Sequence, residues 1–126
     1  MTDEERYPPP YETAEVTRFR REQLPNRDRL RDGGVELHRH YVGSTACVPS
    51  RATLFTGQYP SLHGVSQTDG VAKHNDDPAM RWLDPDGVPT LGDWFRAGGY
   101  STQYRGKWHV SHSDLPVEGS ADGWAA

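Results

Sequence analysis

The sequence predicts an α/β fold with a mostly parallel sheet, and three observations support this. Residues 35–41 and 100–104 have strand-like patterns, proline and glycine mark the ends of several helices, and the two kinds of element are expected to alternate. The expected order is strand, helix, loop, helix, strand, which is typical of layered folds with parallel strands. The 126 residues suffice for one small domain and are too few for two ordinary ones.

The first third of the chain is expected to hold two helices and a strand. Residues 12–24 carry many charges and a thin apolar stripe, which indicates a helix. A second helix is expected over residues 25–32, because proline begins it and Gly33 and Gly34 follow its end. Residues 35–41 then alternate with a period of two, which predicts a strand that leads toward Cys47.

The middle of the chain is expected to hold a short helix and a long loop. The helix begins near Pro49 and ends at Gly57, so Cys47 would lie at its N-terminus. Residues 66–88 are rich in Asp, Gly, Asn, Pro and Lys and show no sustained periodicity. They predict a surface loop, and loops of this length often carry function.

The last expected helix begins after Thr90, a good N-cap residue, and ends at Gly98 and Gly99. Residues 100–104 follow as the second strand. Apolar side chains recur at helical spacing on one face of this helix and are expected in the core: Leu91, Trp94 and Phe95.

Charge, hydropathy and cysteine content exclude several classes of protein. Lys and Arg total 14 against 18 Asp and Glu, and a net charge of −4 argues against a nucleic acid partner. Mean hydropathy is −0.88, and no apolar run approaches the ~20 residues that span a bilayer, so no membrane partner is expected. The acidic opening has no apolar signal region, which predicts a cytoplasmic location. A single cysteine excludes an internal disulfide and a multi-cysteine zinc site.

Cys47 and Arg51 are the first candidates for chemistry. A thiol at a helix N-terminus lies among free N–H groups and at the positive end of the helix dipole, where an anion is favoured. Arg51 lies one turn further on, so its guanidinium could hold two oxygens of a sulfate or phosphate ester while the group at position 47 attacks. The alternative is a buried structural cysteine, because free cysteine is often buried.

The residues around Cys47 form a longer pattern. The run 47–51 reads Cys-Val-Pro-Ser-Arg, and it continues through Thr56-Gly57 and Tyr59-Pro60 to His63-Gly64-Val65. This pattern resembles the signature of the type I sulfatases of the alkaline phosphatase superfamily. A thiol phosphatase would need a longer spacing between cysteine and arginine than the three residues found here.

The resemblance implies a specific chemistry and fold. Cys47 would be oxidised to formylglycine by a formylglycine-generating enzyme, and the hydrated aldehyde would attack the sulfur of a small-molecule sulfate ester. The second hydroxyl of the hydrate would then expel sulfate, which a serine could not do. The fold implied is a partial, truncated version of the alkaline-phosphatase-like sandwich.

Lys107 and His109 resemble part of the second signature of that family. They stand in Gly106-Lys107-Trp108-His109, which follows Gly99-Tyr100-Ser101-Thr102. In an extended segment this spacing directs both side chains to one face, so an ammonium and an imidazole could contact the same sulfate and leaving oxygen. Read alone, the two residues could equally be surface residues.

Asp3 and Glu4 resemble the first metal motif of the family, in which an apolar strand ends in Thr-Asp-Asp. Glu4 stands where the family has its second aspartate. The resemblance implies that Asp3, Glu4 and the residue at Cys47 ligate a calcium ion. Glutamate can ligate calcium through oxygen as aspartate does, although its extra methylene moves the carboxylate. The alternative is a solvated acidic segment.

The resemblance predicts that residues 1–126 form the N-terminal part of a sulfatase catalytic domain. The first strand, a later metal motif and the C-terminal subdomain of that family are not found in the sequence. We therefore expect an incomplete calcium site and no activity from this chain alone. Two alternatives stay open: a phosphonate or phosphodiester hydrolase of the same superfamily, and a non-catalytic truncated fragment.

Overall fold

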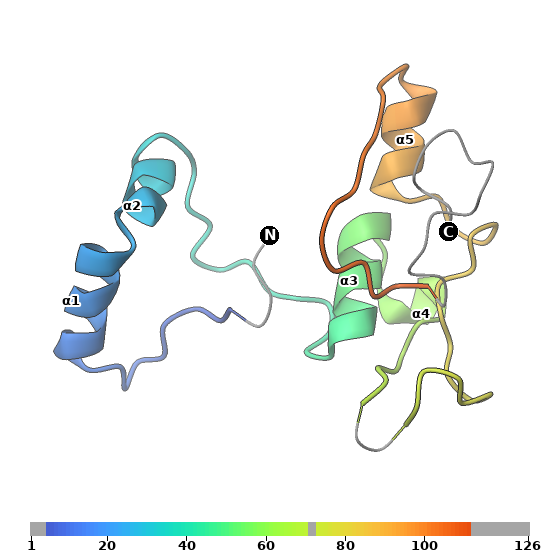
Figure 1. Cartoon of the computed structure of the whole chain (residues 1–126), viewed down its shortest axis with the longest axis horizontal. Coiled ribbons are helices and arrows are strands. Elements are labelled where there is room, and N and C mark those ends of the chain that lie inside the picture. The colour runs from blue at the N-terminus through green and yellow to red at the C-terminus, as the bar shows by residue number, and fades with distance from the viewer. Residues whose placement is uncertain (1–4, 71–72, 112–126) are drawn as a thin grey trace. The chain divides into compact units, whose positions relative to one another are not determined.

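The computed structural model describes residues 5–70 and 73–111, and the chain divides into two compact units between residues 41 and 42. The first unit comprises residues 1–41 and the second unit residues 42–126. Within the described ranges the regular structure consists of five short helices joined by irregular segments (Figure 1). The one β-type pairing among the same residues is an isolated antiparallel bridge between Gly70 and Lys73.

The two helices expected in the first unit are confirmed. Helix α1 spans Ala14–Gln23 and helix α2 spans Pro25–Asp32. Thr13 caps α1, because its side-chain oxygen accepts the N–H of Val16 at 3.4 Å. None of residues 5–41 is buried, so this unit contributes no hydrophobic core within the described residues.

The strands expected over residues 35–41 and 100–104 do not form in the part of the chain that the structure describes. A strand persists when its backbone N–H and C=O groups pair with a neighbour, and no described segment pairs with either run. Residues 35–41 are exposed throughout. The N–H of Tyr100 instead donates to the Phe95 carbonyl at 3.0 Å, which closes the end of the preceding helix. The mostly parallel sheet is thus not seen here.

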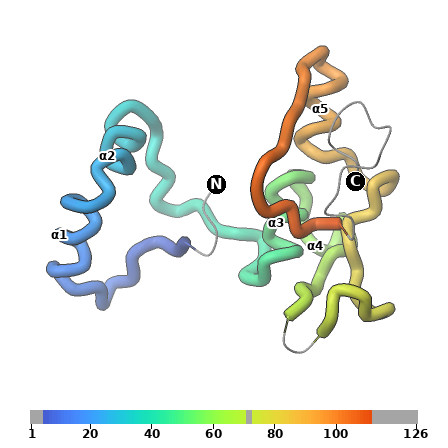
Figure 2. The backbone as a smooth tube through the Cα atoms, in the orientation of Figure 1, coloured from blue at the N-terminus to red at the C-terminus, as the bar shows by residue number. Residues whose placement is uncertain are grey.

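The second unit is built around helix α3, which spans Cys47–Thr56. It begins two residues before the expected start and ends, as expected, at Gly57, whose φ of 69° is readily adopted by glycine. Helix α4 (Pro60–His63) follows and packs on α3. Figure 2 shows the last described segment, drawn in orange to red, running back past α3.

The core of the second unit joins α3 to segments far along the chain. Its buried apolar side chains are Val48, Ala52, Phe55, Val65, Leu83 and Val110. Apart from the Gly70–Lys73 bridge, the described residues of the range 66–88 form no regular element, as expected for a loop, but Met80 and Leu83 among them are buried. The N–H of Leu83 donates to the Val110 carbonyl at 2.9 Å. The predicted surface loop is therefore anchored to the core near its far end.

Helix α5 spans Leu91–Ala97 and is held at its start by a capping box. The Asp93 carboxylate accepts hydrogen bonds from the Thr90 N–H and hydroxyl at 2.6 and 2.7 Å. Burial opposes ionisation of Asp93, but these bonds and the Arg96 guanidinium outweigh it and lower the pKa of the carboxyl.

The expectation that the apolar face of α5 lies in the core is wrong. Its three large apolar side chains are 46 to 64 % exposed: Leu91, Trp94 and Phe95. The buried helical residue is Gly92 instead. Helical spacing identifies which side chains share a face, but it does not say whether another segment covers that face. Phe95 makes an edge-to-face contact with Tyr100, with 5.5 Å between ring centroids.

Candidate active site at the start of helix α3

Cys47 is the first residue of helix α3, so it lies at the helix N-terminus as predicted, although the helix was expected to begin near Pro49. The thiol is free and half-buried. Val48 and Pro49 are fully buried, and they anchor the first turn in the core. Ala46, the N-cap residue, has no side chain that could cap the helix, so the first amides of α3 are not occupied by a capping side chain. This environment suits a group that handles an anion.

Arg51 lies one turn beyond Cys47 and is buried, with 7 % of the residue exposed. Its Nη1 donates a hydrogen bond to the carbonyl of Lys107. The Tyr104 hydroxyl donates to the same carbonyl at 2.5 Å. The structure therefore brings the two sequence signatures together through the Arg51 side chain and the backbone of Lys107, although they are 56 residues apart.

Lys107 and His109 do not lie in a strand. The φ of His109 is 51°, a left-handed value that interrupts an extended segment, so alternation cannot place the two side chains on one face. Lys107 is exposed and His109 is half-buried. The His109 Nε2 lies 2.5 Å from Oδ1 of Asp69, and its ring lies against Trp82.

Sequence analysis missed Asp69 as a partner of His109. The length of the predicted loop 66–88 indicated that this segment could carry function, but it did not indicate which of its residues would do so. Lys73, in the same loop, donates through Nζ to the side chain of Gln67 at 2.6 Å.

His63, a residue of the first signature, supports α3 rather than facing solvent. The Val65 N–H donates to Nδ1 of His63 at 3.1 Å, so the neutral ring carries its proton on Nε2. Nε2 lies 3.2 Å from the Thr53 hydroxyl, which itself donates to the Pro49 carbonyl at 2.8 Å. Burial lowers the pKa of His63 below 6.5, against a smaller opposing effect of a backbone hydrogen bond.

We expect His63 to make the stability of the second unit depend on pH. Because its folded-state pKa is lowered, the unfolded chain takes up the proton first, so stability is complete above pH 6.5 and is lost as the pH falls through the lower, folded-state pKa. Urea unfolding from about pH 7.5 to about pH 5 measures this loss. His63→Gln should flatten the dependence, while His74→Gln, at an exposed position, should leave it unchanged. An unchanged slope in His63→Gln would refute the assignment.

The expected metal ligands Asp3 and Glu4 lie outside the described residues. Among residues 5–70 and 73–111, no group of three His, Cys, Asp or Glu side chains is placed to hold a metal ion. No helix in the same ranges is long and apolar enough to cross a membrane.

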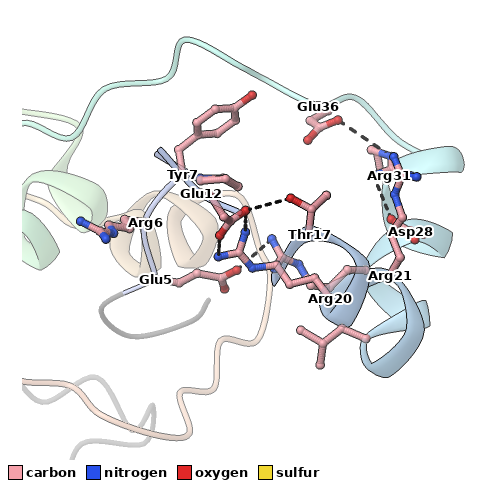
Figure 3. A pocket seen from close by; sticks show the side chains of 13 residues that line it. Glu5, Arg6, Tyr7, Glu12, Thr17, Arg20, Arg21, Asp28, Arg31 and Glu36 are labelled. Carbon is pink, nitrogen blue, oxygen red and sulfur yellow. Dashed lines mark hydrogen bonds and ion pairs between the residues drawn. The ribbon is translucent and has the colours of Figure 1, made fainter. Parts of the chain in front are cut away.

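A cleft of the first unit has a volume of about 510 Å³ and is lined by arginine and acidic side chains (Figure 3). Glu12 accepts from Arg20 at 2.6 Å, and Arg27 pairs with Glu5 at 2.8 Å. Arg31 is paired with acidic side chains in the same way, as the dashed lines in Figure 3 show. Most of the positive charge in the cleft is therefore neutralised within it, which makes it a poor anion site.

Comparison with known proteins identifies the family. The Sulfatase family model matches residues 1–116, which is most of the chain. The chain belongs to the sulfatase family. Membership implies an alkaline-phosphatase-like α/β fold, although the described residues form no strand longer than an isolated bridge. No solved structure matches the chain significantly.

Three relatives show how much of a sulfatase the chain covers. Human steryl-sulfatase is 37 % identical over 91 residues, which are 72 % of this chain and 15 % of that protein. Human arylsulfatase H is 36 % identical over 94 residues, covering 71 % of this chain and 16 % of the relative. Pig N-acetylgalactosamine-6-sulfatase is 31 % identical over 105 residues, with shares of 81 % and 20 %. The chain thus spans at most a fifth of the length of these sulfatases.

Proposed function

We propose that this sulfatase-family protein is a sulfuric ester hydrolase that cleaves small-molecule sulfate esters through a formylglycine derived from Cys47. The observation that carries the proposal is the position of Cys47 as the first residue of α3, with buried Arg51 one turn beyond it. The relatives are named as sulfatases, among them steryl-sulfatase and arylsulfatase H, which favours sulfate over phosphonate or phosphodiester substrates.

Position 47 suits a formylglycine residue. The side chain is half-buried at the N-terminus of a ten-residue helix, whose N-cap residue Ala46 makes no side-chain capping bond. A formylglycine hydrate there would supply an oxygen nucleophile and a second hydroxyl that allows the sulfate to be released. The first amides of α3 and its dipole favour the negative charge of the sulfate group.

Arg51, Lys107 and His109 are the other proposed catalytic residues. Arg51 is buried in the second unit, where a guanidinium interacts with an anion more strongly than it would in water. Its bond to the Lys107 carbonyl holds the start of the second signature beside α3. We assign the Lys107 ammonium to charge stabilisation of the sulfate and the His109 imidazole to proton exchange with the leaving oxygen.

Calcium enters the proposal through the family resemblance, with Asp3, Glu4 and the residue at Cys47 as its ligands. Oxygen ligands of this kind suit calcium. Because the described residues hold no cluster of three such ligands, we derive no catalytic step through the ion.

Mass spectrometry of the Cys47 peptide tests the proposal. After expression of the chain with a formylglycine-generating enzyme, the peptide should lose about 18 Da, because sulfur and two hydrogens leave and one oxygen enters. The chain expressed without that enzyme, and the Cys47→Ala variant, are the controls and should show no such loss. An unmodified thiol, under conditions in which the enzyme converts a second sulfatase peptide, would reject the assignment of Cys47.

A further inference from the structure

Asp69 and His109 form a close pair across 40 residues of sequence. The His109 Nε2 lies 2.5 Å from Asp69 Oδ1, and the two side chains are 22 and 24 % exposed. Most of both groups is therefore withdrawn from water, where a hydrogen bond to a carboxylate is stronger than at an open surface.

The backbone around the pair holds the His109 ring in place. The next residue, Val110, is fully buried, and its carbonyl accepts the N–H of Leu83. The Trp82 ring lies with its centroid 6.0 Å from that of His109. His109 itself has a φ of 51°, which is uncommon for a residue with a side chain and requires support from its surroundings.

This arrangement makes the two ring nitrogens of His109 unequal. An ionised carboxylate accepts hydrogen bonds and donates none, so the proton between Asp69 and His109 belongs to Nε2. The other nitrogen, Nδ1, is buried and has no hydrogen-bond partner among the described residues. Nδ1 is therefore the ring atom at which a proton can be gained or lost while the bond to Asp69 persists.

We propose that Asp69 is a positioning residue for His109: it holds the Nε2–H, fixes the orientation of the ring and leaves Nδ1 as the proton-exchanging atom. This inference rests on the proposed function, in which His109 exchanges a proton with the leaving oxygen. A carboxylate that accepts one N–H of an imidazole selects the tautomer and holds the ring for chemistry at its other nitrogen.

Nitrogen NMR of the chain labelled with ¹⁵N-histidine tests the proposal without requiring turnover. In the neutral ring, Nε2 of His109 should give the resonance of a protonated nitrogen and Nδ1 that of an unprotonated one. When the ring takes up a second proton, Nδ1 should move to the protonated position while Nε2 stays in place. Wild-type spectra in which the two nitrogens are averaged, or in which Nε2 titrates, would overturn the proposal.

Three variants separate the role of Asp69 from a general effect on the fold. Asp69→Ala should make the two His109 nitrogen resonances converge, because the ring loses the acceptor that selects its tautomer. Asp69→Asn should restore their separation, because the amide oxygen accepts the same N–H. The matched control Asp76→Ala, at an exposed position in the same loop, should leave both resonances unchanged. Unchanged resonances in Asp69→Ala, or convergence in Asp69→Asn, would count against Asp69.

The two experiments distinguish a failure of the Asp69 proposal from a failure of the proposed function. Conversion of Cys47 is measured by mass and the His109 tautomer by NMR, so either result can fail while the other stands. A converted Cys47 with an averaged His109 ring would remove Asp69 from the site and leave the hydrolase proposal in place.

Discussion

Phe55→Ala is expected to lower the free energy of unfolding of the second unit by about 3–5 kcal/mol, which is a large part of the stability of an ordinary domain. The Phe55 side chain is buried in α3. Its ring is stacked on Trp108 with 5.0 Å between centroids and meets the edge of Tyr104 at 5.7 Å. Alanine would leave a cavity between α3 and the segment that carries Lys107, so this change should also weaken the contact between the two signatures.

Urea unfolding followed by tryptophan fluorescence measures the effect of Phe55→Ala, because Trp82 and Trp108 pack against the same core. Leu54→Ala is the matched control: it lies next to Phe55 in α3 but is 54 % exposed. We expect Leu54→Ala to change the free energy of unfolding by less than about 1 kcal/mol. Equal losses in the two variants would contradict the placement of Phe55 in the core.

In a full-length sulfatase that contains this chain, Cys47→Ala is expected to reduce sulfate ester hydrolysis by a factor on the order of 10⁵–10⁶, the scale seen when a hydrolase loses its nucleophile. The fold should be unaffected, because Cys47 is only half-buried and alanine is a good helix former. Release of nitrophenol from nitrophenyl sulfate, together with the helical circular dichroism signal, measures both properties. Retained turnover in a correctly folded Cys47→Ala protein would exclude Cys47 as the nucleophile precursor.

Cys47→Ser gives a sharper version of the same experiment. A serine hydroxyl can attack sulfur, but it carries a single oxygen and has no second hydroxyl with which to release the sulfate. We therefore expect at most one sulfate transferred per chain, seen as a gain of about 80 Da on the peptide that contains position 47. Repeated turnover by Cys47→Ser would show that the chemistry does not need an aldehyde.

Four of the five described helices could be predicted from the sequence because their signals are local, whereas the single-turn helix α4 was not predicted. Pro25 begins α2, Gly57 ends α3 in a left-handed conformation, and Thr90 with Asp93 closes the start of α5. Each of these signals involves residues within one or two turns of one another, so no knowledge of distant contacts is needed.

The strands and the environment of α5 could not be predicted, because both depend on distant partners. Residues 35–41 alternate correctly for a strand, yet no described segment pairs with them. Leu91 and Trp94 share a helix face, yet in the described part of the chain they remain exposed. Hydrophobic periodicity indicates whether a segment prefers a helix or a strand. Burial of its side chains and pairing of its backbone depend on the segments that lie beside it.

For the candidate site, too, the local spacing could be predicted from the sequence and the long-range contacts could not. Cys47 and Arg51 lie one helical turn apart, and the structure bears this spacing out. The link from Arg51 to the Lys107 carbonyl and the pair formed by Asp69 and His109 join segments that are 56 and 40 residues apart. No local pattern specifies such contacts, since they exist only after the second unit has folded.

The core of the second unit has a consequence for the time course of biosynthesis. Val48, beside Cys47, belongs to the same buried cluster as Val110, so the core around the start of α3 cannot be completed until Val110 has been made. At about 5–20 residues per second, the roughly 60 residues between them take on the order of 3–12 s to synthesise. During that interval the Cys47 segment emerges from the ribosome without the partners that later half-bury the thiol. A maturation enzyme that acts as the chain grows would therefore reach an open peptide, whereas one that acts later would meet Cys47 half-buried in the first turn of α3.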